Sequence, residues 1–369
     1  MTTKVEVYKP KNYIRVVTAT SLFDGHDAAI NIMRRILQDT GIEVIHLGHN
    51  RSVHEIVEAA IEEDVQGIAV SSYQGGHIEF FKYMVDLLKE KGATHIKIFG
   101  GGGGVIVPDE IAELHAYGVT KIYSPEDGSR LGLQGMINHM VKTIDFSTVK
   151  KGPFAIDDLS PDNKLRVSNL ISVMEQAKVQ QNGDLAALRA ELSKKIGNRK
   201  TPVIGITGTG GAGKSSLTDE LILRMLHDIK DIYIAIISCD PTRRKTGGAL
   251  LGDRIRMNAI GNPRVFLRSL ATRTSQTEIP EVLTESIEAA KAGVDVTLLD
   301  ENERPGGQIY RQLEKGFKVS DSKALGRDYE KGLQLLRQFS SLGDRIQYWN
   351  NTQVWGIFKD QTLALARNG

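Results

Sequence analysis

The fold of the first half of the chain is decided by Arg15-Val-Val-Thr-Ala-Thr-Ser-Leu-Phe-Asp24-Gly25-His26-Asp27-Ala-Ala29, an apolar run that ends in a polar turn. Residues 15–20 are rich in β-branched side chains, which predicts a buried strand. The next stretch places apolar residues at three- and four-residue spacing, which predicts a helix with one buried face: Ala29, Ile30, Met33, Ile36 and Leu37. The polar turn therefore lies at the carboxyl end of a strand, where open α/β sheets bind ligands.

Further strands alternate with helical stretches up to about residue 144, namely 43–47, 67–71, 96–99 and 121–123. This alternation predicts an α/β fold with a parallel, doubly wound sheet. In a flavodoxin-like (Rossmann-like) order, the first, third and fourth strands are neighbours, so the loops that follow them meet at one edge of the sheet. These loops are 24–29, 71–77 and 100–104, and their polar and glycine residues predict a ligand site.

Composition excludes several classes of protein. The chain has 369 residues and a formal net charge of +2 from 47 basic and 45 acidic side chains, so nothing indicates binding to nucleic acid or to an anionic membrane. Cys239 is the single cysteine, which excludes an internal disulfide framework and is typical of a reducing compartment. No apolar run is long enough to span a bilayer, and the first residues lack the apolar core of a signal peptide. We therefore expect a cytoplasmic protein.

The sequence divides into four regions. Residues 1–145 form the first α/β domain, and residues 146–200 read as a helical linker with Ser160 as a helix N-cap before Pro161. A second α/β domain over 201–290 opens with a strand at 203–207, a glycine-rich turn and a helix from about Lys214. We interpret this domain as incomplete. Residues 291–369 form a divergent tail.

The glycine-rich turn of the second domain, Gly208-Thr-Gly-Gly-Ala-Gly213-Lys214-Ser215, matches the phosphate-loop pattern G-x-x-x-x-G-K-S between a predicted strand and a predicted helix. Its backbone N–H groups cradle phosphates, Lys214 reaches the β- and γ-phosphates, and Ser215 ligates Mg²⁺. Chance occurrence in a loop is the alternative, which the flanking elements disfavour. The predicted nucleotide-binding residues are Gly208, Gly210, Gly211, Gly213, Lys214, Ser215 and Ser216.

Two acidic residues follow the phosphate loop along the chain. Asp240 follows directly after Cys239 at the end of the strand predicted over 233–238, and Asp253 lies thirteen residues further along the chain. Paired carboxylates suit a hard cation such as Mg²⁺, whereas either residue alone reads equally as a solvated turn residue. The sequence therefore predicts Lys214, Asp240 and Asp253 as the catalytic residues of nucleotide hydrolysis, with Ser215 and both aspartates around the metal.

His26 is the candidate metal ligand of the first domain. Asp24 lies two residues earlier, close enough to accept the Nδ1 proton of the imidazole and to leave Nε2 free to bind a metal. The alternative is a histidine at a helix N-terminus that bonds only to Asp24 and water, because a single histidine is a weak metal signature.

The loops of the first domain resemble the cobalamin-binding domain of acyl-CoA mutases and methionine synthases, whose pattern is Asp-x-His-x-x-Gly, then Ser-x-Leu, then Gly-Gly. It occurs here as Asp24-Gly-His26-Asp-Ala-Ala29, Ser71-Ser-Tyr73 and Gly103-Gly104, with Ala29 and Tyr73 as departures. The resemblance implies that His26 is the lower ligand of cobalt and that the nucleotide tail of cobalamin runs into the sheet. The implied cofactor-binding residues are Asp24, His26, Ser71, Tyr73, Gly103 and Gly104.

Sequence stretches in both domains resemble more specific families. Ser-Leu-Phe-Asp-Gly-His-Asp-Ala and Ser-Ser-Tyr-Gln-Gly-Gly-His resemble the fused isobutyryl-CoA mutases, and Asp240-Pro-Thr with Gly-Asp253-Arg-Ile-Arg resembles the metallochaperone GTPases that serve cobalamin mutases. Together the resemblances cover residues 14–290. They imply adenosylcobalamin, GTP and Mg²⁺, and they imply a homodimer that works with a mutase barrel or with full-length mutase subunits.

By this resemblance, the full-length enzyme interconverts isobutyryl-CoA and n-butyryl-CoA, and its GTPase gates cofactor loading. A substrate-binding barrel takes about 250 residues by itself. No segment of this chain can form one, so we interpret the chain as truncated relative to that family and expect no mutase turnover from it alone. A cobalamin carrier without catalysis, with a vestigial nucleotide site, is the first alternative.

The resemblance to these GTPases ends after residue 290. The Glu-Thr-Ser-Gly-Ile-Gly-Gln and Asn-Lys-x-Asp motifs of the GTPases do not occur, and the stretch 293–310, with Asp300 at the end of a strand, resembles a fragment of an FAD-dependent oxidoreductase. The G-x-G-x-x-G turn that a flavin site needs is missing before it, since no glycine lies between Gly261 and Gly293. Our hypothesis is that the chain is a composite, in which a truncated fused mutase is joined near residue 290 to a fragment of an oxidoreductase. A flavin oxidoreductase acting through the tail is the second alternative.

Overall fold

The computed structural model describes the chain in several stretches and divides it into two compact units. The described residues are 5–149, 154, 156, 159–180, 184–196, 204–206, 213–240, 242–243, 246–273, 283, 296–299, 346–349, 352–357 and 363–367. The first unit comprises Met1–Leu192 and Asp231–Ala290, and the second comprises Ser193–Lys230 and Lys291–Gly369. The first unit therefore combines residues from both predicted α/β regions.

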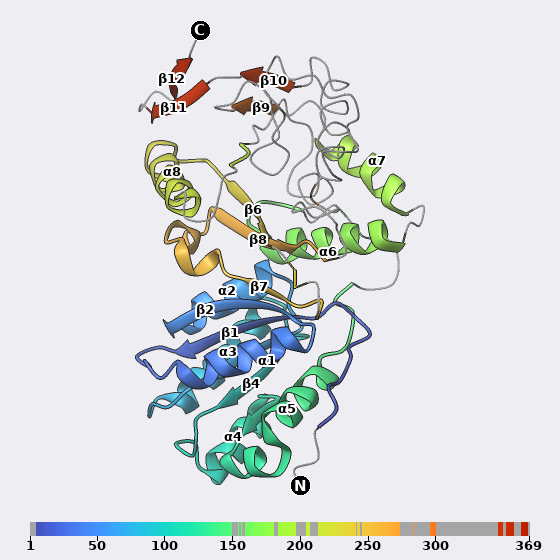
Figure 1. The fold of residues 1–369 in the computed structure, drawn as a ribbon, viewed down its shortest axis with the longest axis vertical. Helices are drawn as coiled ribbons and strands as arrows, with labels where there is room; N and C mark the ends of the chain where they lie inside the picture. Colours follow the sequence, from blue (N-terminus) through green and yellow to red (C-terminus); the bar gives the residue numbers. More distant parts are fainter. Residues whose placement is uncertain are drawn as a thin grey trace, which may run out of the picture. The chain divides into compact units, whose positions relative to one another are not determined.

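The first unit is built on a six-stranded parallel sheet (Figure 1). Its strands are β1 (Arg15–Ser21), β2 (Glu43–Arg51), β3 (Gly67–Ser71), β4 (Lys97–Gly101), β5 (Lys121–Tyr123) and β7 (Ala249–Leu251). The order is β5-β4-β3-β1-β2-β7, and all neighbours pair in parallel. The predicted flavodoxin-like fold is confirmed, with the first, third and fourth strands side by side. The sixth strand, β7, comes from a distant part of the chain and covers the edge of β2.

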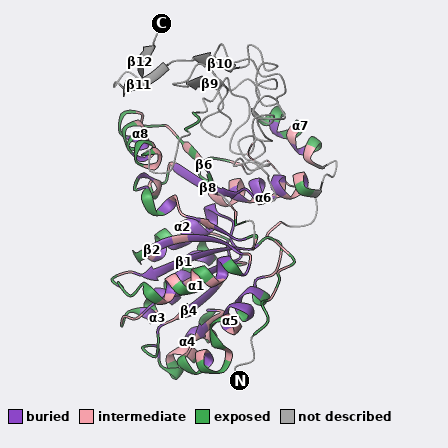
Figure 2. Cartoon of the chain, in the orientation of Figure 1, coloured by how far each residue is buried: buried purple, intermediate pink, exposed green. Residues whose placement is uncertain are grey.

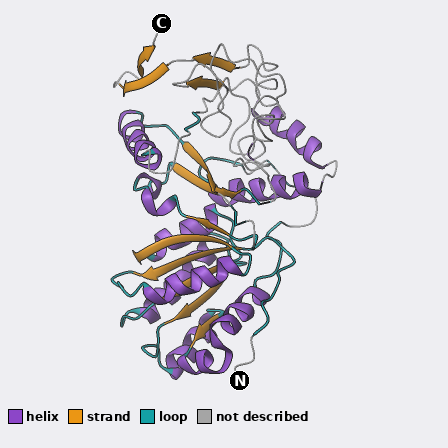
Figure 3. Ribbon diagram, viewed as in Figure 1, coloured by secondary structure: helices purple, strands orange, loops and turns teal. Residues whose placement is uncertain are grey.

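Helices cover both faces of this sheet (Figure 3). They are α1 (Ala28–Asp39), α2 (Val53–Glu62), α3 (His77–Glu90), α4 (Pro108–Tyr117) and α5 (Pro125–Thr143). One core cluster packs α2, α3 and α4 against the strands, and the other packs α1 and α5. Every residue of β1 is buried, as expected for a central strand with helices on both sides (Figure 2).

A second group of elements completes the first unit. It contains α6 (Lys164–Gln180), the short turns η1 (Arg254–Arg256) and η2 (Ala259–Gly261), and the parallel strands β6 (Ile234–Asp240) and β8 (Val265–Ala271). The predicted N-cap at Ser160 is wrong. Ser160 begins a turn, and α6 starts at Lys164 because the side chain of Asn163 accepts a hydrogen bond from the Arg166 backbone N–H at 3.3 Å.

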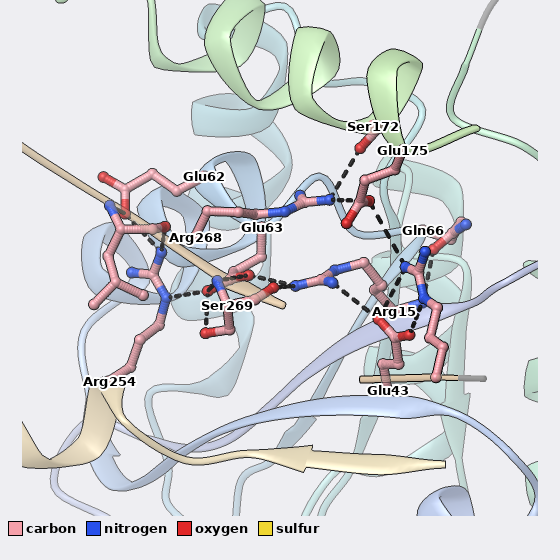
Figure 4. A network of polar contacts seen from close by, with 12 residues as sticks. Arg15, Glu43, Glu62, Glu63, Gln66, Ser172, Glu175, Arg254, Arg268 and Ser269 are labelled. Atoms are coloured by element: carbon pink, nitrogen blue, oxygen red, sulfur yellow. Dashed lines mark hydrogen bonds and ion pairs between the residues drawn. The ribbon is translucent and has the colours of Figure 1, made fainter. Parts of the chain in front are cut away.

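A network of buried charges joins the two groups of elements in the first unit (Figure 4). Arg15 on β1 donates hydrogen bonds to Glu43 at 2.9 Å and to Glu63. Arg254 donates to Glu63 at 2.9 Å and to Glu62 at 2.7 Å. Glu63 is thus shared by a guanidinium from the sheet and one from the later segment, which ties residues 254–256 to the end of α2.

The same network extends to α6 and β8. Arg268 donates to Ser172 at 3.0 Å and to Glu175 at 3.3 Å, and Arg273 donates to Glu43 at 2.7 Å. Burial raises the pKa of Glu43, but the guanidinium groups of Arg273 and Arg15 outweigh it and lower the pKa to about 2. Glu43 is therefore a carboxylate at neutral pH, fully paired inside the protein.

In the second unit, the described elements are α8 (Lys214–Asp228) and four strands, together with the end of α7 (Asp184–Ile196). The strands β9 (Val296–Leu299) and β10 (Ile346–Trp349) pair in parallel, and β11 (Thr352–Ile357) and β12 (Leu363–Arg367) pair antiparallel. The strand predicted over 203–207 is not formed at its described residues 204–206, where Ile204 and Ile206 are exposed. Of the helices that the structure describes, none is both long and apolar enough to cross a membrane.

Candidate functional site

Hydrogen bonds join the loops at the carboxyl edge of β1, β3 and β4. The Tyr73 backbone N–H donates to Oδ2 of Asp24 at 2.6 Å, which joins the β3–α3 loop to the β1–α1 loop. The Ser72 N–H donates to the Gly101 carbonyl at 2.8 Å, and Ser21 Oγ donates to Ser72 Oγ at 2.9 Å. Ser71 and Ser72 are both buried. The three loops predicted to meet are therefore held together, with Asp24 between two of them.

The Asp24 carboxylate determines which ring nitrogen of His26 carries the proton. The Asp24 side chain is fully buried, and its Oδ1 accepts hydrogen bonds from the His26 backbone N–H at 2.8 Å and from Nδ1 of the His26 ring at 2.9 Å. Burial raises the pKa of Asp24, but hydrogen bonds from the Tyr73 and His26 backbones and from the His26 ring outweigh it, so the pKa lies below its ordinary value. An ionised Asp24 needs a proton on Nδ1, which leaves Nε2 as the nitrogen that can bind a metal.

The ring of His26 is exposed to solvent, whereas the Asp24 carboxylate that it contacts is buried. The His26 side chain is 76% exposed. The ring of Tyr73 lies beside it, with the centroids 5.5 Å apart and the planes tilted by 41°. An imidazole oriented by a buried carboxylate and open on its other nitrogen has the arrangement of a metal ligand.

The glycine run at the end of β4 packs so closely against neighbouring residues that side chains would not fit there. A Cβ on Gly102 would lie 2.2 Å from the Ser72 carbonyl oxygen, and one on Gly103 would lie 2.5 Å from the Tyr73 ring. Gly103 and Gly104 also have φ values of +55° and +98°, which favour glycine. Backbone can therefore approach both Tyr73 and a flat ligand closely along this loop.

Two of the three predicted magnesium ligands, Asp240 and Asp253, lie close together in the first unit. Ser238 Oγ donates a hydrogen bond to Oδ2 of Asp253, and the neighbouring Asp240 has a buried Oδ2 without a partner among the described residues. Burial and the charge of Asp253 raise the pKa of Asp240 to about 7. Such a pair gains from a cation between the carboxylates, although no group of three or more histidine, cysteine or acidic residues among the described residues makes a complete metal site.

The described part of the phosphate loop lies in the second unit. Gly213 has a φ of +80° and precedes α8, whose first residue is Lys214, as predicted. Ser215 and Ser216 lie in the first turn of this helix, where backbone N–H groups attract anions. Gly208, Gly210, Gly211 and Asp300 lie outside the described residues.

Comparison with known proteins identifies both domains. Residues 14–126 match the family model described as "B12 binding domain", and residues 167–302 match "Methylmalonyl Co-A mutase-associated GTPase MeaB". Over 297 residues, which cover 80% of this chain, the sequence is 60% identical to the fused isobutyryl-CoA mutase of Geobacillus kaustophilus. Over most of its length, the chain is therefore similar to fused isobutyryl-CoA mutases. It spans about a quarter of that relative, since the match covers 27% of the Geobacillus protein.

Two further similarities concern shorter parts of this chain. It is 36% identical over 110 residues to the 2-hydroxyisobutanoyl-CoA mutase small subunit of Aquincola tertiaricarbonis, covering 30% of this chain and 79% of that protein. It is also 41% identical over 90 residues to one of the subunits of the opine oxidase of Rhizobium meliloti, covering 24% of this chain and 16% of that protein. The second similarity agrees with the oxidoreductase resemblance predicted from the sequence.

The described residues of the first domain fit a cobalamin. The oriented imidazole of His26 offers cobalt a free nitrogen, and the loop at Gly102 and Gly103 has no room for side chains beside Ser72 and Tyr73. These two features lie on loops that Asp24 and Ser72 hold together. The fit comes from this chain's own geometry and agrees with the family.

Sequence reasoning missed several residues of these loops. Gly102 makes the closest approach to Ser72 but lies outside the two glycines of the family pattern. His77 and Glu110 join the β3–α3 and β4–α4 loops through their side chains. Only the long glycine run could have signalled Gly102, whereas a contact between residues 33 positions apart leaves no local signal.

Proposed function

We propose that this chain is the cobalamin- and GTP-binding part of an adenosylcobalamin-dependent isobutyryl-CoA mutase. The observation that carries the proposal is the hydrogen bond between the buried Asp24 carboxylate and Nδ1 of the exposed His26. This hydrogen bond orients the ring so that Nε2 is the nitrogen open to bind a metal.

Each residue of the first site has a role in this proposal. His26 would hold cobalt through Nε2, and Asp24 orients its ring. Ser71, Gly103 and Gly104 line the path of the nucleotide tail, and Tyr73 lies between His26 and the glycine loop. Adenosylcobalamin supplies the homolysis of a cobalt–carbon bond, and the protein supplies ligation and positioning.

The nucleotide site has a second set of roles. The loop residues Gly208, Gly210, Gly211 and Gly213 hold the phosphates of GTP together with Lys214, Ser215 and Ser216. The phosphate-loop motif assigns Ser215 to Mg²⁺, and the family resemblance assigns Asp240 and Asp253 to the magnesium and switch region. The raised pKa of Asp240 supports a role near a cation, because a cation would stabilise its ionised form. GTP hydrolysis gates the loading of cofactor onto a mutase barrel, and the family resemblance makes a homodimer the working assembly.

Titration with adenosylcobalamin tests the first site. The purified chain is titrated and the visible spectrum recorded for wild type, for His26→Ala, and for His54→Ala, an exposed histidine on α2 that serves as the control. We expect wild type and His54→Ala to bind cobalamin with histidine in place of its own base, and His26→Ala to lose this spectrum. Absence of binding, or the same spectrum in all three proteins, would contradict the proposal.

A cobalamin carrier without catalysis is the second candidate, because the Glu-Thr-Ser-Gly-Ile-Gly-Gln and Asn-Lys-x-Asp motifs of the GTPases do not occur in this sequence. Hydrolysis of GTP separates the two functions. Hydrolysis that Lys214→Ala abolishes and Arg224→Ala, on the exposed side of the same helix, retains would support the GTPase. Nucleotide binding without hydrolysis in wild type would support the carrier.

A further inference from the structure

A line of hydrogen bonds crosses the three loops at the carboxyl edge of the sheet. The Leu22 carbonyl accepts from Gln74 Nε2, and the Gln74 carbonyl accepts from Nδ1 of His77 at 2.9 Å. Nε2 of His77 lies 3.0 Å from Oε2 of Glu110, and the same oxygen accepts from the Val107 backbone N–H at 2.9 Å. The line therefore ties the loops after β1, β3 and β4 to one another.

The centre of this line is a contact between a buried histidine and a partly exposed carboxylate. The side chain of His77 is 4% exposed, so water competes little for its ring. Both partners of the ring are acceptors, a carbonyl at Nδ1 and a carboxylate at Nε2. Hydrogen bonds from Val107 and His77 keep the pKa of Glu110 below its ordinary value, so Glu110 is an ionised acceptor in this line.

The loops joined by this pair are the walls of the proposed cobalamin site. Tyr73 directly precedes Gln74, and Gly103 and Gly104 lie four and three residues before Val107. The Tyr73 ring approaches Gly103 so closely that no side chain fits between them. A small change in the separation of the loops therefore moves the Tyr73 ring relative to His26.

We infer that His77 and Glu110 are positioning residues for cobalamin binding, which set the separation of the Tyr73 loop and the glycine loop. This inference rests on the proposed function of the first site. The contacts of the pair do not include Asp24 or His26, so the pair sets the affinity for cobalamin while the cobalt ligand stays the same.

The helices α3 and α4 share a second ion pair that provides a matched control. Lys82 on α3 pairs with Glu113 on α4, one turn beyond Glu110, and the Glu113 side chain is about half exposed. If the pair at Glu110 acted only by packing the two helices, removing Glu113 would have a similar effect on cobalamin binding.

The experiment measures the Kd of adenosylcobalamin for the full chain by absorbance. We expect His77→Ala and Glu110→Ala to raise the Kd about tenfold, the effect of losing one charge-assisted hydrogen bond. The spectrum at saturation stays that of the wild type. Glu110→Gln stays within about twofold, because its amide oxygen can replace Oε2 and accept hydrogen bonds from both the Val107 backbone N–H and the His77 ring. Glu113→Ala binds as the wild type does.

Each other outcome counts against the inference. An unchanged Kd in Glu110→Ala, an equal loss in Glu113→Ala, or no rescue in Glu110→Gln overturns it, while the wild-type spectrum still supports the proposed function. Failure of the wild type to bind cobalamin overturns the proposed function and this inference with it. If His77→Ala does not fold, the three variants at the more exposed Glu110 and Glu113 decide the question, with thermal unfolding measured on each.

Discussion

At the residue scale, a single carboxylate connects the fold to the chemistry. Asp24 accepts hydrogen bonds from Tyr73 and from His26, so the same side chain that joins two loops also fixes the imidazole. The sequence predicted the contact with His26 from a spacing of two residues. It did not predict the bond to Tyr73, because that contact depends on the arrangement of β1 and β3.

Replacement of Asp24 by asparagine tests this dual role. An amide cannot supply negative charge to the ring, and its NH₂ group would face one of the donors that Asp24 accepts. We expect cobalamin binding to weaken about 10- to 100-fold, the usual effect of removing the partner of a metal-binding histidine. Unchanged affinity in Asp24→Asn, with Asp27→Asn as the control, would mean that Asp24 only shapes the loop.

His46 predicts a pH dependence of stability. Burial and the nearby charge of Arg34 lower the pKa of His46 from 6.5 to about 4. Between these values the unfolded chain takes up a proton that the folded chain refuses, so the free energy of unfolding falls as the pH falls from 6.5 to 4. Urea unfolding at pH 7 and pH 5 measures the loss. It should be smaller in His46→Gln, whose amide still reaches Thr18, and an equal loss in both proteins would contradict the assignment.

At the scale of elements, the loops supply the residues of the candidate site, and the strands position those loops. The strand order followed from the alternation of strands and helices, and the structure confirmed it. Local signals were weaker at the start of α6, where Asn163 caps the helix instead of Ser160. Both residues are good caps, so only the fold of the linker distinguishes them.

Substitution of one glycine tests whether the loop after β4 needs its close backbone approach. Gly102→Ala places a Cβ 2.2 Å from the Ser72 carbonyl, which must move. We expect a loss of about 1–3 kcal/mol in the free energy of unfolding and weaker cobalamin binding. Gly75→Ala, in a neighbouring loop with nothing within 4 Å, is the control and should be neutral in both assays. Neutral behaviour of Gly102→Ala would show that the loop has room to spare.

At the scale of the whole molecule, the first unit joins residues that the sequence assigned to separate domains. The strand β7 pairs with β2, and Arg254 next to Asp253 pairs with Glu62 and Glu63. No local pattern indicates such pairs, because a buried arginine and an exposed one look alike in a sequence. The motifs for cobalamin and for GTP were predictable, whereas the network that connects their neighbourhoods was not.

Glu63 is the residue whose loss should damage this network most. Glu63→Gln leaves Arg15 and Arg254 buried with less negative charge, so we expect a loss of about 3–5 kcal/mol in the free energy of unfolding. Asp39→Asn breaks the exposed pair with Arg243, which also joins distant parts of the chain, and should cost less than about 1 kcal/mol. Chemical denaturation measures both, and equal small effects would mean that the network contributes little.

The central claim, that a histidine of this chain binds the cobalt of cobalamin, is tested most directly by electron paramagnetic resonance of the bound, reduced cob(II)alamin. The chain is prepared with ordinary histidine and with ¹⁵N-labelled histidine. Our account predicts that the histidine nitrogen bound to cobalt splits the cobalt lines into triplets in the first sample and into doublets in the ¹⁵N-labelled sample. In His26→Ala, labelling of the histidines should not change the spectrum, because no histidine binds cobalt. Triplets in both samples would show that cobalamin keeps its own base and would contradict the account.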